Sequence, residues 1–293
     1  MNDEELTRRF PRSHRYSLDW IREGGMGSHP LWLAEWLSEG LTLEPGMRVL
    51  DLGCGKAKSS IFLAREFGVE VWAADLWVSP SENIHRIRAA DLDAGDCPDC
   101  SARKNGTVPL PGRVIPLRAD AHKLPFAADY FDVITAHDCY SYFGTDDLFL
   151  NYLVQFVKPG GQIGIAGAGL AQGITGPLPE HLVPIWSHDF WCLHSARWWH
   201  NHWSRTGLVE VERADDMPNA AEIWAHWQRK NSPDNTAEIN AVEQDAGRYL
   251  SYIRMVARRN PGIELVSYCW PDGSFSLPQA YEPHPIEDSG STK

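Results

Sequence analysis

The chain has 293 residues and a formal net charge of −12, with the hydrophobic (43%) and charged (23%) content of an ordinary globular protein. The acidic balance argues against a nucleic-acid partner, because phosphate backbones are bound by clustered lysine and arginine. No apolar run in the sequence approaches the roughly 20 residues that cross a bilayer, and the first residues do not have the pattern of a signal peptide. We therefore expect no membrane partner and a cytoplasmic location.

Strand and helix patterns alternate from residue 30 onward. Apolar residues at helical spacing predict helices, and continuous apolar runs predict buried strands. In chain order the expected elements are helix 30–37, strand 47–52, helix 57–67, strand 69–74, helix 79–91, strand 114–117, strand 130–136, helix 148–157 and strand 162–166. Turn residues over 94–112 predict a surface loop. Five strands with helices between most of them predict a parallel, doubly wound sheet.

The rhythm changes after Gly167. Residues 178–206 are expected to be helical and aromatic, and residues 208–212 to form a sixth strand. Residues 217–260 are expected to form two helices, the second from about 237 to 258, followed by a seventh strand over 263–268. The proline-containing tail after Trp270 is expected to be loosely held.

The most informative segment is Val49–Gly55 (VLDLGCG), an apolar run that breaks into a Gly-x-Gly turn before a helix. Glycines let the backbone approach a ligand and adopt dihedrals that other residues avoid. Asp75, at the end of the next strand, is placed to hold the two hydroxyls of a ribose. The segment therefore predicts a nucleotide pocket at the carboxyl edge of the sheet.

Four segments together resemble the class I S-adenosylmethionine (SAM) dependent methyltransferases. They are VLDLGCG (49–55), VWAAD (71–75), ADAHKLPF with YFDVI (119–126 and 130–134), and LVQFVKPGGQIG (153–164). The resemblance is close over about 26–167 and extends in outline to the last strands. It implies an α/β, Rossmann-like, seven-stranded methyltransferase fold with a helical cap.

The resemblance also implies a division of the chain. Residues 1–45 would form N-terminal lid helices, 46–167 the SAM-binding core, 168–270 helical cap insertions with the last two strands, and 271–293 a loosely ordered tail.

The residues around the glycine turn favour SAM over a dinucleotide. A dinucleotide fingerprint has a third glycine three residues after the second, where this chain has Lys58. Many methyltransferases carry a third glycine at the position of Ala57, and alanine is small enough for close helix packing there. Asp51, two residues before the first glycine, can orient the methionine amino group.

The resemblance assigns the cofactor contacts to individual residues. Asp51, Gly53 and Gly55 would line the methionine and ribose side of SAM, Asp75 would accept from the ribose hydroxyls, and Leu76 would touch adenine. Asp120 and Ala121 would meet the adenine amino group and ring, and the His137 backbone would contact SAM. For Asp75 the structural alternative is a helix cap, and for Asp120 a loop carboxylate.

Four residues are candidates for catalysis or for contact with the methyl acceptor. His137 and Asp138 follow the fourth strand, where such sheets bind ligands. The His137 ring could accept a proton, and Asp138 corresponds to an acid that meets the amine in small-amine methyltransferases. Those relatives have a histidine four residues later, where this chain has Tyr142. Simple capping of the turn is the alternative for His137 and Asp138.

The N-terminal region resembles the lid of the same small-molecule relatives. Tyr16 and the glycine-rich hinge at 24–28 carry this similarity. A hinged segment of this kind can close over a cofactor and exclude water. Tyr16 is therefore the fourth candidate for a catalytic role, and a flexible leader is the alternative.

Two further patterns have mainly structural interpretations. Of 13 tryptophans, seven lie between Trp186 and Trp227; they could wall a substrate pocket, but most are expected to pack helices on the sheet. The four histidines between 188 and 202 lack the i, i+4 spacing of a helical zinc pair. Cys97 and Cys100 have the spacing of a zinc half-site without a second pair, so we expect no metal, and zinc or a disulfide there stays an alternative.

The sequence thus predicts an enzyme that uses SAM to methylate a small-molecule acceptor at N, O or S, with an amine favoured. Its alternatives are a cyclopropane-synthase-like enzyme acting on lipid chains and a non-catalytic SAM-binding protein. A homodimer is compatible with the sequence, which does not set the oligomeric state. A cavity facing the cofactor would separate these alternatives, by its presence and by the polarity of its wall.

Overall fold

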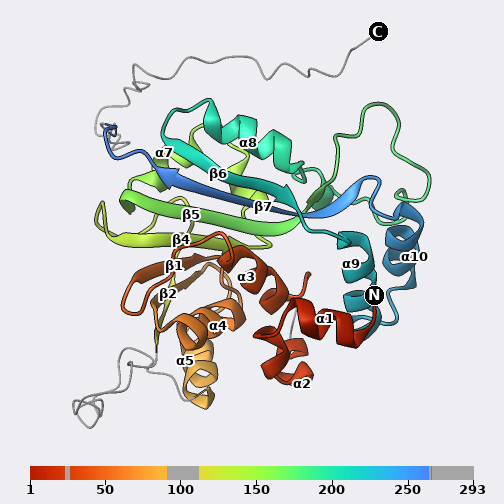
Figure 1. The fold of residues 1–293 in the computed structure, drawn as a ribbon, viewed down its shortest axis with the longest axis horizontal. Helices are drawn as coiled ribbons and strands as arrows, with labels where there is room; N and C mark the ends of the chain where they lie inside the picture. Colours follow the sequence, from red (N-terminus) through yellow and green to blue (C-terminus); the bar gives the residue numbers. More distant parts are fainter. Residues whose placement is uncertain (24–26, 91–111, 264, 266–293) are drawn as a thin grey trace.

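The computed structural model describes residues 1–23, 27–90, 112–263 and 265. Its centre is a seven-stranded sheet in the order β3-β2-β1-β4-β5-β7-β6, which crosses the molecule in Figure 1. The strands are β1 (Arg48–Leu52), β2 (Glu70–Asp75), β3 (Arg113–Arg118), β4 (Phe131–His137), β5 (Val157–Leu170), β6 (Val209–Asp216) and β7 (Leu250–Arg259). The α/β, Rossmann-like, seven-stranded fold expected from the sequence is confirmed.

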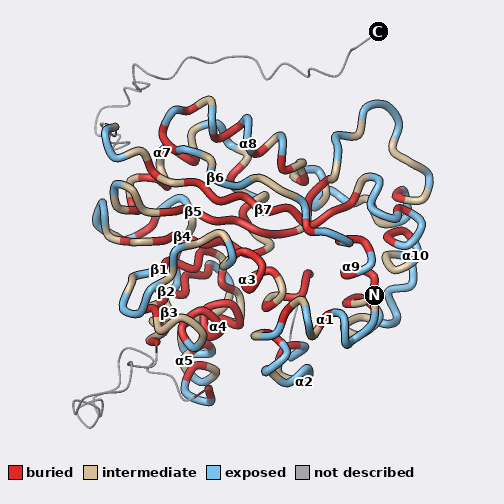
Figure 2. The backbone as a smooth tube through the Cα atoms, viewed as in Figure 1, coloured by how far each residue is buried: buried red, intermediate tan, exposed pale blue. Residues whose placement is uncertain are grey.

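The first five strands are parallel, and β7 runs antiparallel to both β5 and β6. Parallel strands need crossover helices, which cover both faces of the sheet and shield its strands from solvent. Here the central strands β1, β4, β5 and β7 are correspondingly buried over most of their length, whereas the edge strands β3 and β6 are only partly covered (Figure 2). Because the carboxyl ends of β1, β2 and β4 share one edge, the residues that follow these strands come together there.

Successive residues of a strand point to opposite faces, and the helices divide accordingly. Leu50 and Ile134 pack toward one cluster of buried side chains, which includes residues of α7 and α8. Val49 and Val133 pack toward the other, which includes residues of α3 and α4. The helices of the fold are α1 (Asp3–Arg9), α2 (Leu18–Arg22), α3 (Pro30–Ser38), α4 (Lys58–Phe67), α5 (Pro80–Ala89), α6 (Ser141–Gly144), α7 (Phe149–Val154), α8 (Ala196–Ser204), α9 (Ala220–Asn231) and α10 (Thr236–Asp245).

The expected second helix over 237–258 is wrong in its second half. Helix α10 ends at Asp245, where Ala246 and Gly247 both adopt positive φ, and the chain then forms β7. Eight successive residues from Leu250 are buried, so the strand has no alternation of polar and apolar residues. A strand of this kind cannot be told from a buried helix by periodicity alone.

The seventh strand is therefore 250–259 and not 263–268. Of the latter range, only residues 263 and 265 are described, and neither is in a strand. The remaining cap is also less helical than expected. Within 178–206 the structure has α8 and the short 3-10 turn η3 (His188–Phe190), because Pro179 and Pro184 interrupt the stretch before them.

The N-terminal segment folds as short helices that lie against α3 and α4. A buried carboxylate, Glu35 on α3, accepts hydrogen bonds from the backbone N–H groups of Arg12 and Ser13 and from the Ser13 hydroxyl. These bonds hold the turn η1 (Ser13–Arg15) in place. None of the helices in the described ranges combines the length and apolar character that a bilayer crossing requires. The predicted loop 94–112, apart from Gly112, and the tail 271–293 lie outside the described residues.

Candidate active site

The glycine turn after β1 has the geometry that its sequence predicts. Gly53 and Gly55 have φ of 71° and 51°, in the left-handed region that favours glycine. A Cβ at Gly53 would lie 2.5 Å from the Cys139 Sγ, whereas a Cβ at Gly55 would meet nothing within 4 Å. Ala57, where many methyltransferases have glycine, is also left-handed, with φ of 56°. The first glycine is thus needed for packing against the segment that follows β4, and the second leaves room for a ligand.

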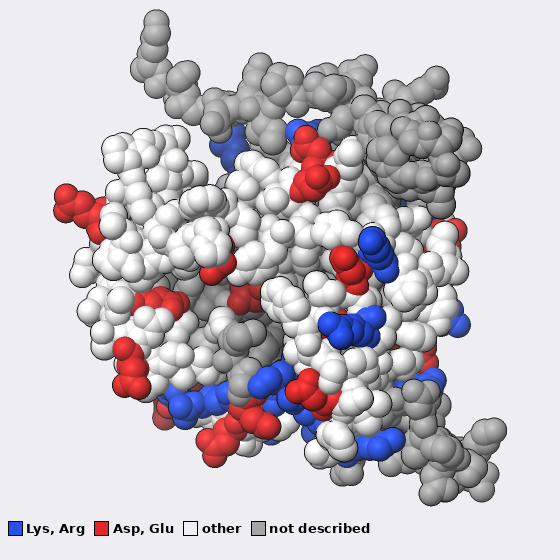
Figure 3. All heavy atoms as spheres, turned by 180° about the vertical axis from the view of Figure 1, so that it is seen from behind, with Lys and Arg blue, Asp and Glu red and all other residues white. Residues whose placement is uncertain are grey.

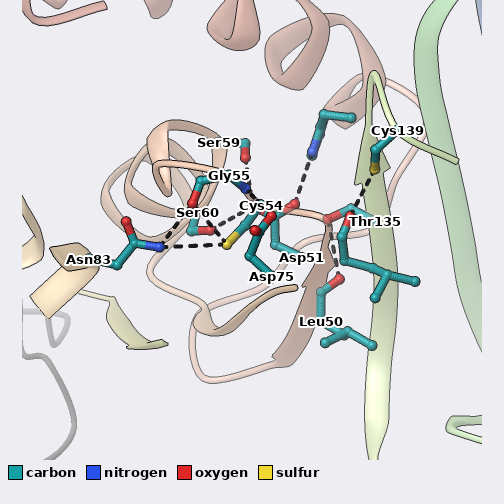
Figure 4. Close-up of polar contacts among 12 residues, drawn as sticks. Leu50, Asp51, Cys54, Gly55, Ser59, Ser60, Asp75, Asn83, Thr135 and Cys139 are labelled. Atoms are coloured by element: carbon teal, nitrogen blue, oxygen red, sulfur yellow. Dashed lines mark hydrogen bonds and ion pairs between the residues drawn. The ribbon is translucent and has the colours of Figure 1, made fainter. Parts of the chain in front are cut away.

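Asp75 organises this turn as well as the one that follows β2. One carboxylate oxygen accepts the Gly55 N–H at 2.8 Å, and the other accepts the N–H groups of Trp77 and Val78, each at 2.8 Å. Figure 4 shows the Asp75 side chain directed at the Gly55 backbone. Asp75 does not cap α5, since the cap of that helix is Ser79. Next to it, Leu76 and Trp77 expose 45% and 80% of their surface, so apolar groups stand free beside the predicted ribose acid.

Asp51 lies in a closed network. Its fully buried carboxylate accepts hydrogen bonds from the hydroxyls of Ser59 and Ser60, each at 2.6 Å (Figure 4), and lies 3.1 Å from the His137 Nδ1. Two serines in the first turn of α4 therefore fix an acid at the end of β1. The His137 Nε2 is buried and has no hydrogen-bond partner among the described residues. The structure thus joins Asp51 to His137, and the direct contact of Asp51 with a methionine amino group stays a prediction.

Asp120 and Ala121 lie on the loop after β3. The Asp120 carboxylate accepts the backbone N–H of His122, and this bond together with the His122 ring lowers its pKa. The Ala119 N–H donates to the Asp75 carbonyl, so the loop is fixed beside the end of β2. Ala121 packs on the core below. The predicted adenine side is therefore adjacent to the predicted ribose acid.

Asp138 connects three parts of the chain at the end of β4. It adopts a left-handed φ of 57°, which aims its side chain away from the strand. Its carboxylate accepts the Ser28 N–H and the Ala168 N–H, each at 2.9 Å. The Gly27 carbonyl beside this contact accepts the Trp227 indole N–H at 2.9 Å. Asp138 therefore fastens the segment after the N-terminal hinge to the end of β5.

A cavity of about 420 Å³ opens beside Asp138. It is walled by the N-terminal segment, by the ends of β4 and β5, by the region of η3 and by the junction of α9 and α10. The lining residues are Gly27, Ser28, Asp138, Tyr142, Ala168, Asp189, Phe190, Leu193, Trp224, Gln228, Asn231, Ser232, Asn235 and Glu238. Burial and then the charge of Asp138 raise the pKa of Tyr142 to about 12, so its hydroxyl stays protonated at neutral pH.

Tyr16 is not brought to this cavity. Its hydroxyl donates to Glu66 at 3.0 Å, near the carboxyl end of α4, and its ring stacks on Trp20. Burial raises the pKa of the Tyr16 hydroxyl far above its usual range. The catalytic role of Tyr16 therefore stays a prediction for which the structure offers no contact. Lys58 links the same region to the glycine turn, since its ammonium donates to the Trp20 carbonyl at 2.5 Å.

The sequence did not indicate most of the residues that line the cavity. Trp224, Gln228, Asn231, Asn235 and Glu238 come from α9 and α10, which have no motif. The excess of tryptophan gave a partial signal: Trp224 lines the cavity, whereas Trp199 and Trp203 are fully buried in the core, in the packing role expected for most of them. No group of three His, Cys, Asp or Glu among the described residues could hold a metal ion. Cys97 and Cys100 lie outside the described residues.

Charges on the surface are mixed. On the face opposite to that of Figure 1, basic side chains of the described residues lie among acidic ones rather than forming one broad basic surface (Figure 3). This face therefore gives no support to a nucleic-acid partner.

The sheet order, the glycine turn and the acids that follow β1 and β2 define a Rossmann-like methyltransferase architecture of class I. The open space at Gly55 and the acid that ends β2 fit SAM as the cofactor. Comparison with known proteins agrees, because residues 50–165 match the family described as "Methyltransferase domain". The match and the fold support a class I SAM-dependent methyltransferase whose matched domain is residues 50–165, with SAM as the cofactor.

Relatives support this assignment, and solved structures support the fold. The chain is 30% identical to the 2-methyl-6-phytyl-1,4-hydroquinone methyltransferase of Synechocystis, over 64% of this chain and 55% of the relative. It is 33% identical to the ubiquinone/menaquinone biosynthesis C-methyltransferase of Vibrio campbellii, over 47% of each chain. The fold is similar to that of a Haemonchus contortus phosphoethanolamine N-methyltransferase solved with SAM (TM-score 0.59, 20% identity, 88% of this chain and 59% of that one). The chain spans about half the length of the curated relatives it matches.

Proposed function

We propose that this protein transfers the methyl group of SAM to the nitrogen of a small amine bound in the cavity beside Asp138. The observation that carries the proposal is the charge of the cavity wall. Asp138, Asp189 and Glu238 supply three carboxylates, and no Lys, Arg or His is among the described residues that line the cavity. A wall of this kind favours a cation and repels an anion.

The aromatic groups of the wall support the same acceptor. Tyr142, Phe190 and Trp224 line the cavity together with the acids, and aromatic faces attract ammonium groups. A phosphorylated or carboxylated acceptor would find no cationic side chain among the described lining residues. The chain therefore differs at this point from what an acceptor such as phosphoethanolamine, named for the Haemonchus neighbour, would need.

The residues of the site have separate tasks in this proposal. SAM supplies a methyl group already activated on a sulfonium, so the chain must mainly align the nitrogen and exclude water. Asp138 holds the amine at the end of β4 and keeps the Gly27–Ser28 backbone closed over it. The pKa of Tyr142 is about 12, so its hydroxyl keeps its proton at neutral pH. This uncharged hydroxyl orients the amine. His137, with Asp51 beside its Nδ1, directly precedes Asp138 but is not among the residues that line the cavity, so its role as acceptor for the proton of the amine stays a prediction.

The polarity of the wall bears on the alternatives. A lipid chain would need an apolar tunnel, whereas this wall carries three acids and several amide and hydroxyl side chains. A purely SAM-binding protein would need no second cavity beside the methyl donor. A hydroquinone, of the kind named for the Synechocystis relative, is the acceptor that the test compares with amines.

The test is a screen with labelled SAM against small amines, hydroquinones and diphosphate esters. The proposal expects label in the amines only. With an accepted amine, Asp138→Asn should raise the KM for that amine about tenfold, because a charge-assisted hydrogen bond is lost, with the KM for SAM little changed. Asp132→Asn is the matched control, since this acid lies at the opposite end of β4 from Asp138 and pairs with Lys158. Label in hydroquinones and in no amine would overturn the proposal.

A further inference from the structure

A second carboxylate faces the acceptor cavity from the wall opposite the sheet. Glu238 lies on α10, which packs on α9, whereas Asp138 follows β4. The two acids are thus contributed by different walls of one cavity. Burial raises the pKa of the Tyr252 hydroxyl, and the charges of Asp138 and Glu238 both raise it further, so both carboxylates act on the same buried group.

Glu238 is held rigidly by neutral donors. Its Oε1 accepts the Trp224 indole N–H and the Gln228 amide N–H, each at 2.8 Å, and its Oε2 accepts the Asn235 amide N–H at 2.7 Å. Trp224 is itself fixed by stacking on Tyr252, with ring centroids 5.0 Å apart. Three donors from α9 and from the start of α10 therefore aim one carboxylate, and they do so without supplying a positive charge.

The charge of Glu238 is left without a counter-ion in the described part of the chain. A carboxylate offers about four acceptor positions, and the three donors leave one of them free. Asp138 is in the same state, because its two described partners are the neutral N–H groups of Ser28 and Ala168. Two acids that each lack a cation repel each other across a shared cavity, and a ligand with two positive groups relieves both.

We propose that the acceptor carries a second cationic nitrogen that binds Glu238, so that its class is a small aliphatic diamine and Glu238 is a specificity-determining residue. This inference rests on the proposed function, which needs Asp138 and one nitrogen only. Glu238 adds the selection of a diamine over a monoamine of equal length. The aromatic Trp224, which donates to Glu238 and lines the cavity, covers the aliphatic part of the ligand.

The experiment compares 1,4-diaminobutane with 1-aminobutane by calorimetric titration of the protein saturated with S-adenosylhomocysteine. In the wild type the diamine should bind about tenfold or more tightly than the monoamine, as one charge-assisted hydrogen bond implies. Glu238→Gln keeps the oxygen that accepts from Trp224 and removes the charge. It should abolish the difference by weakening the diamine while leaving the monoamine unchanged.

Glu243→Gln is the matched control, because Glu243 also lies on α10 but pairs with Arg229 away from the cavity. It should leave the preference for the diamine intact. The inference is overturned if the wild type binds both amines equally, a result that needs no variant to fold, or if Glu238→Gln retains the full preference. Failure of the proposed function would look different: neither amine would bind or receive label.

Discussion

The cofactor edge and the acceptor cavity lie on either side of the end of β4, yet they are built from different parts of the chain. At the cofactor edge the acids are satisfied by nearby groups: Asp75 accepts three backbone N–H groups and Asp51 accepts two serine hydroxyls. In the cavity, Asp138 and Glu238 face open space: Asp138 accepts the N–H groups of Ser28 and Ala168, which are distant in the sequence, and Glu238 is held by side chains of the neighbouring helix α9 and of its own N-cap.

This difference explains why the cofactor edge can be common to a family while the acceptor cavity can vary between its members. A site made of backbone groups and glycines needs only a short stretch of sequence, so it can be shared by a family whose members differ in their acceptors. A cavity made of side chains from α9, α10 and the N-terminal segment can change without disturbing the sheet. The proposed function therefore assigns acceptor specificity to the second region. Each of the following changes should affect one region more than the other.

The largest effect should come from Asp75→Ala at the cofactor edge. It removes the predicted ribose acceptor and leaves the N–H groups of Gly55, Trp77 and Val78 without their partner. We expect SAM affinity to fall by roughly tenfold or more and the free energy of unfolding to fall by about 3 kcal/mol. Calorimetric titration and denaturant unfolding measure the two quantities. Asp120→Ala, on the neighbouring loop, should leave stability nearly unchanged, and unaltered SAM binding in Asp75→Ala would remove the ribose assignment.

Two glycine substitutions separate packing from ligand space within the same turn. Gly53→Ala places a Cβ against the Cys139 Sγ at a positive φ, and it should lower the free energy of unfolding by about 2 kcal/mol. Gly55→Ala meets no atom within 4 Å, so it should cost about 1 kcal/mol of backbone strain and mainly weaken SAM binding. Adding Cys139→Ala should restore part of the stability lost in Gly53→Ala. Equal losses of stability for the two glycines would contradict this division.

Acidification should act on the acceptor side through His29. This residue caps α3, and its ring stacks on Trp32 beside the Gly27–Ser28 segment. Burial lowers its pKa from 6.5 to about 3, so the unfolded chain binds the proton first as the pH falls. The contribution of neutral His29 to the free energy of unfolding is fully present above about pH 6.5. It is lost as the pH falls below this value, by up to about 1.4 kcal/mol for each pH unit.

The measurement is the unfolding free energy at about pH 7.5 and about pH 5.5 in the wild type and in His29→Asn. Asparagine can keep the cap but does not titrate, so the variant should lose about 1.4 kcal/mol less than the wild type over this range. Identical pH dependence in the two proteins would show that His29 is not the group responsible.

The two regions also differ in how far the sequence predicted them. The VLDLGCG turn, Asp75 and the loop of Asp120 were predicted because each depends on residues that are neighbours in the sequence. Strand β7 was assigned as a helix, since burial on both faces removes the alternation that marks a strand. Glu238 and Trp224 were missed because only the packing of α9 on β7 and of α10 on α9 brings them to the cavity of Asp138. Tyr16 was proposed by similarity, and its hydroxyl bonds to Glu66.

Cofactor and acceptor are proposed to bind to separable sets of residues on either side of the end of β4. The most direct measurement is a pair of calorimetric titrations, with S-adenosylhomocysteine and then with 1-aminobutane, on Asp75→Ala and Asp138→Asn. Asp75→Ala should weaken the binding of S-adenosylhomocysteine by about tenfold or more. Asp138→Asn should weaken the binding of the amine by about tenfold and leave that of S-adenosylhomocysteine within about twofold of the wild type. An Asp138→Asn protein that loses S-adenosylhomocysteine binding as strongly as amine binding would contradict this separation.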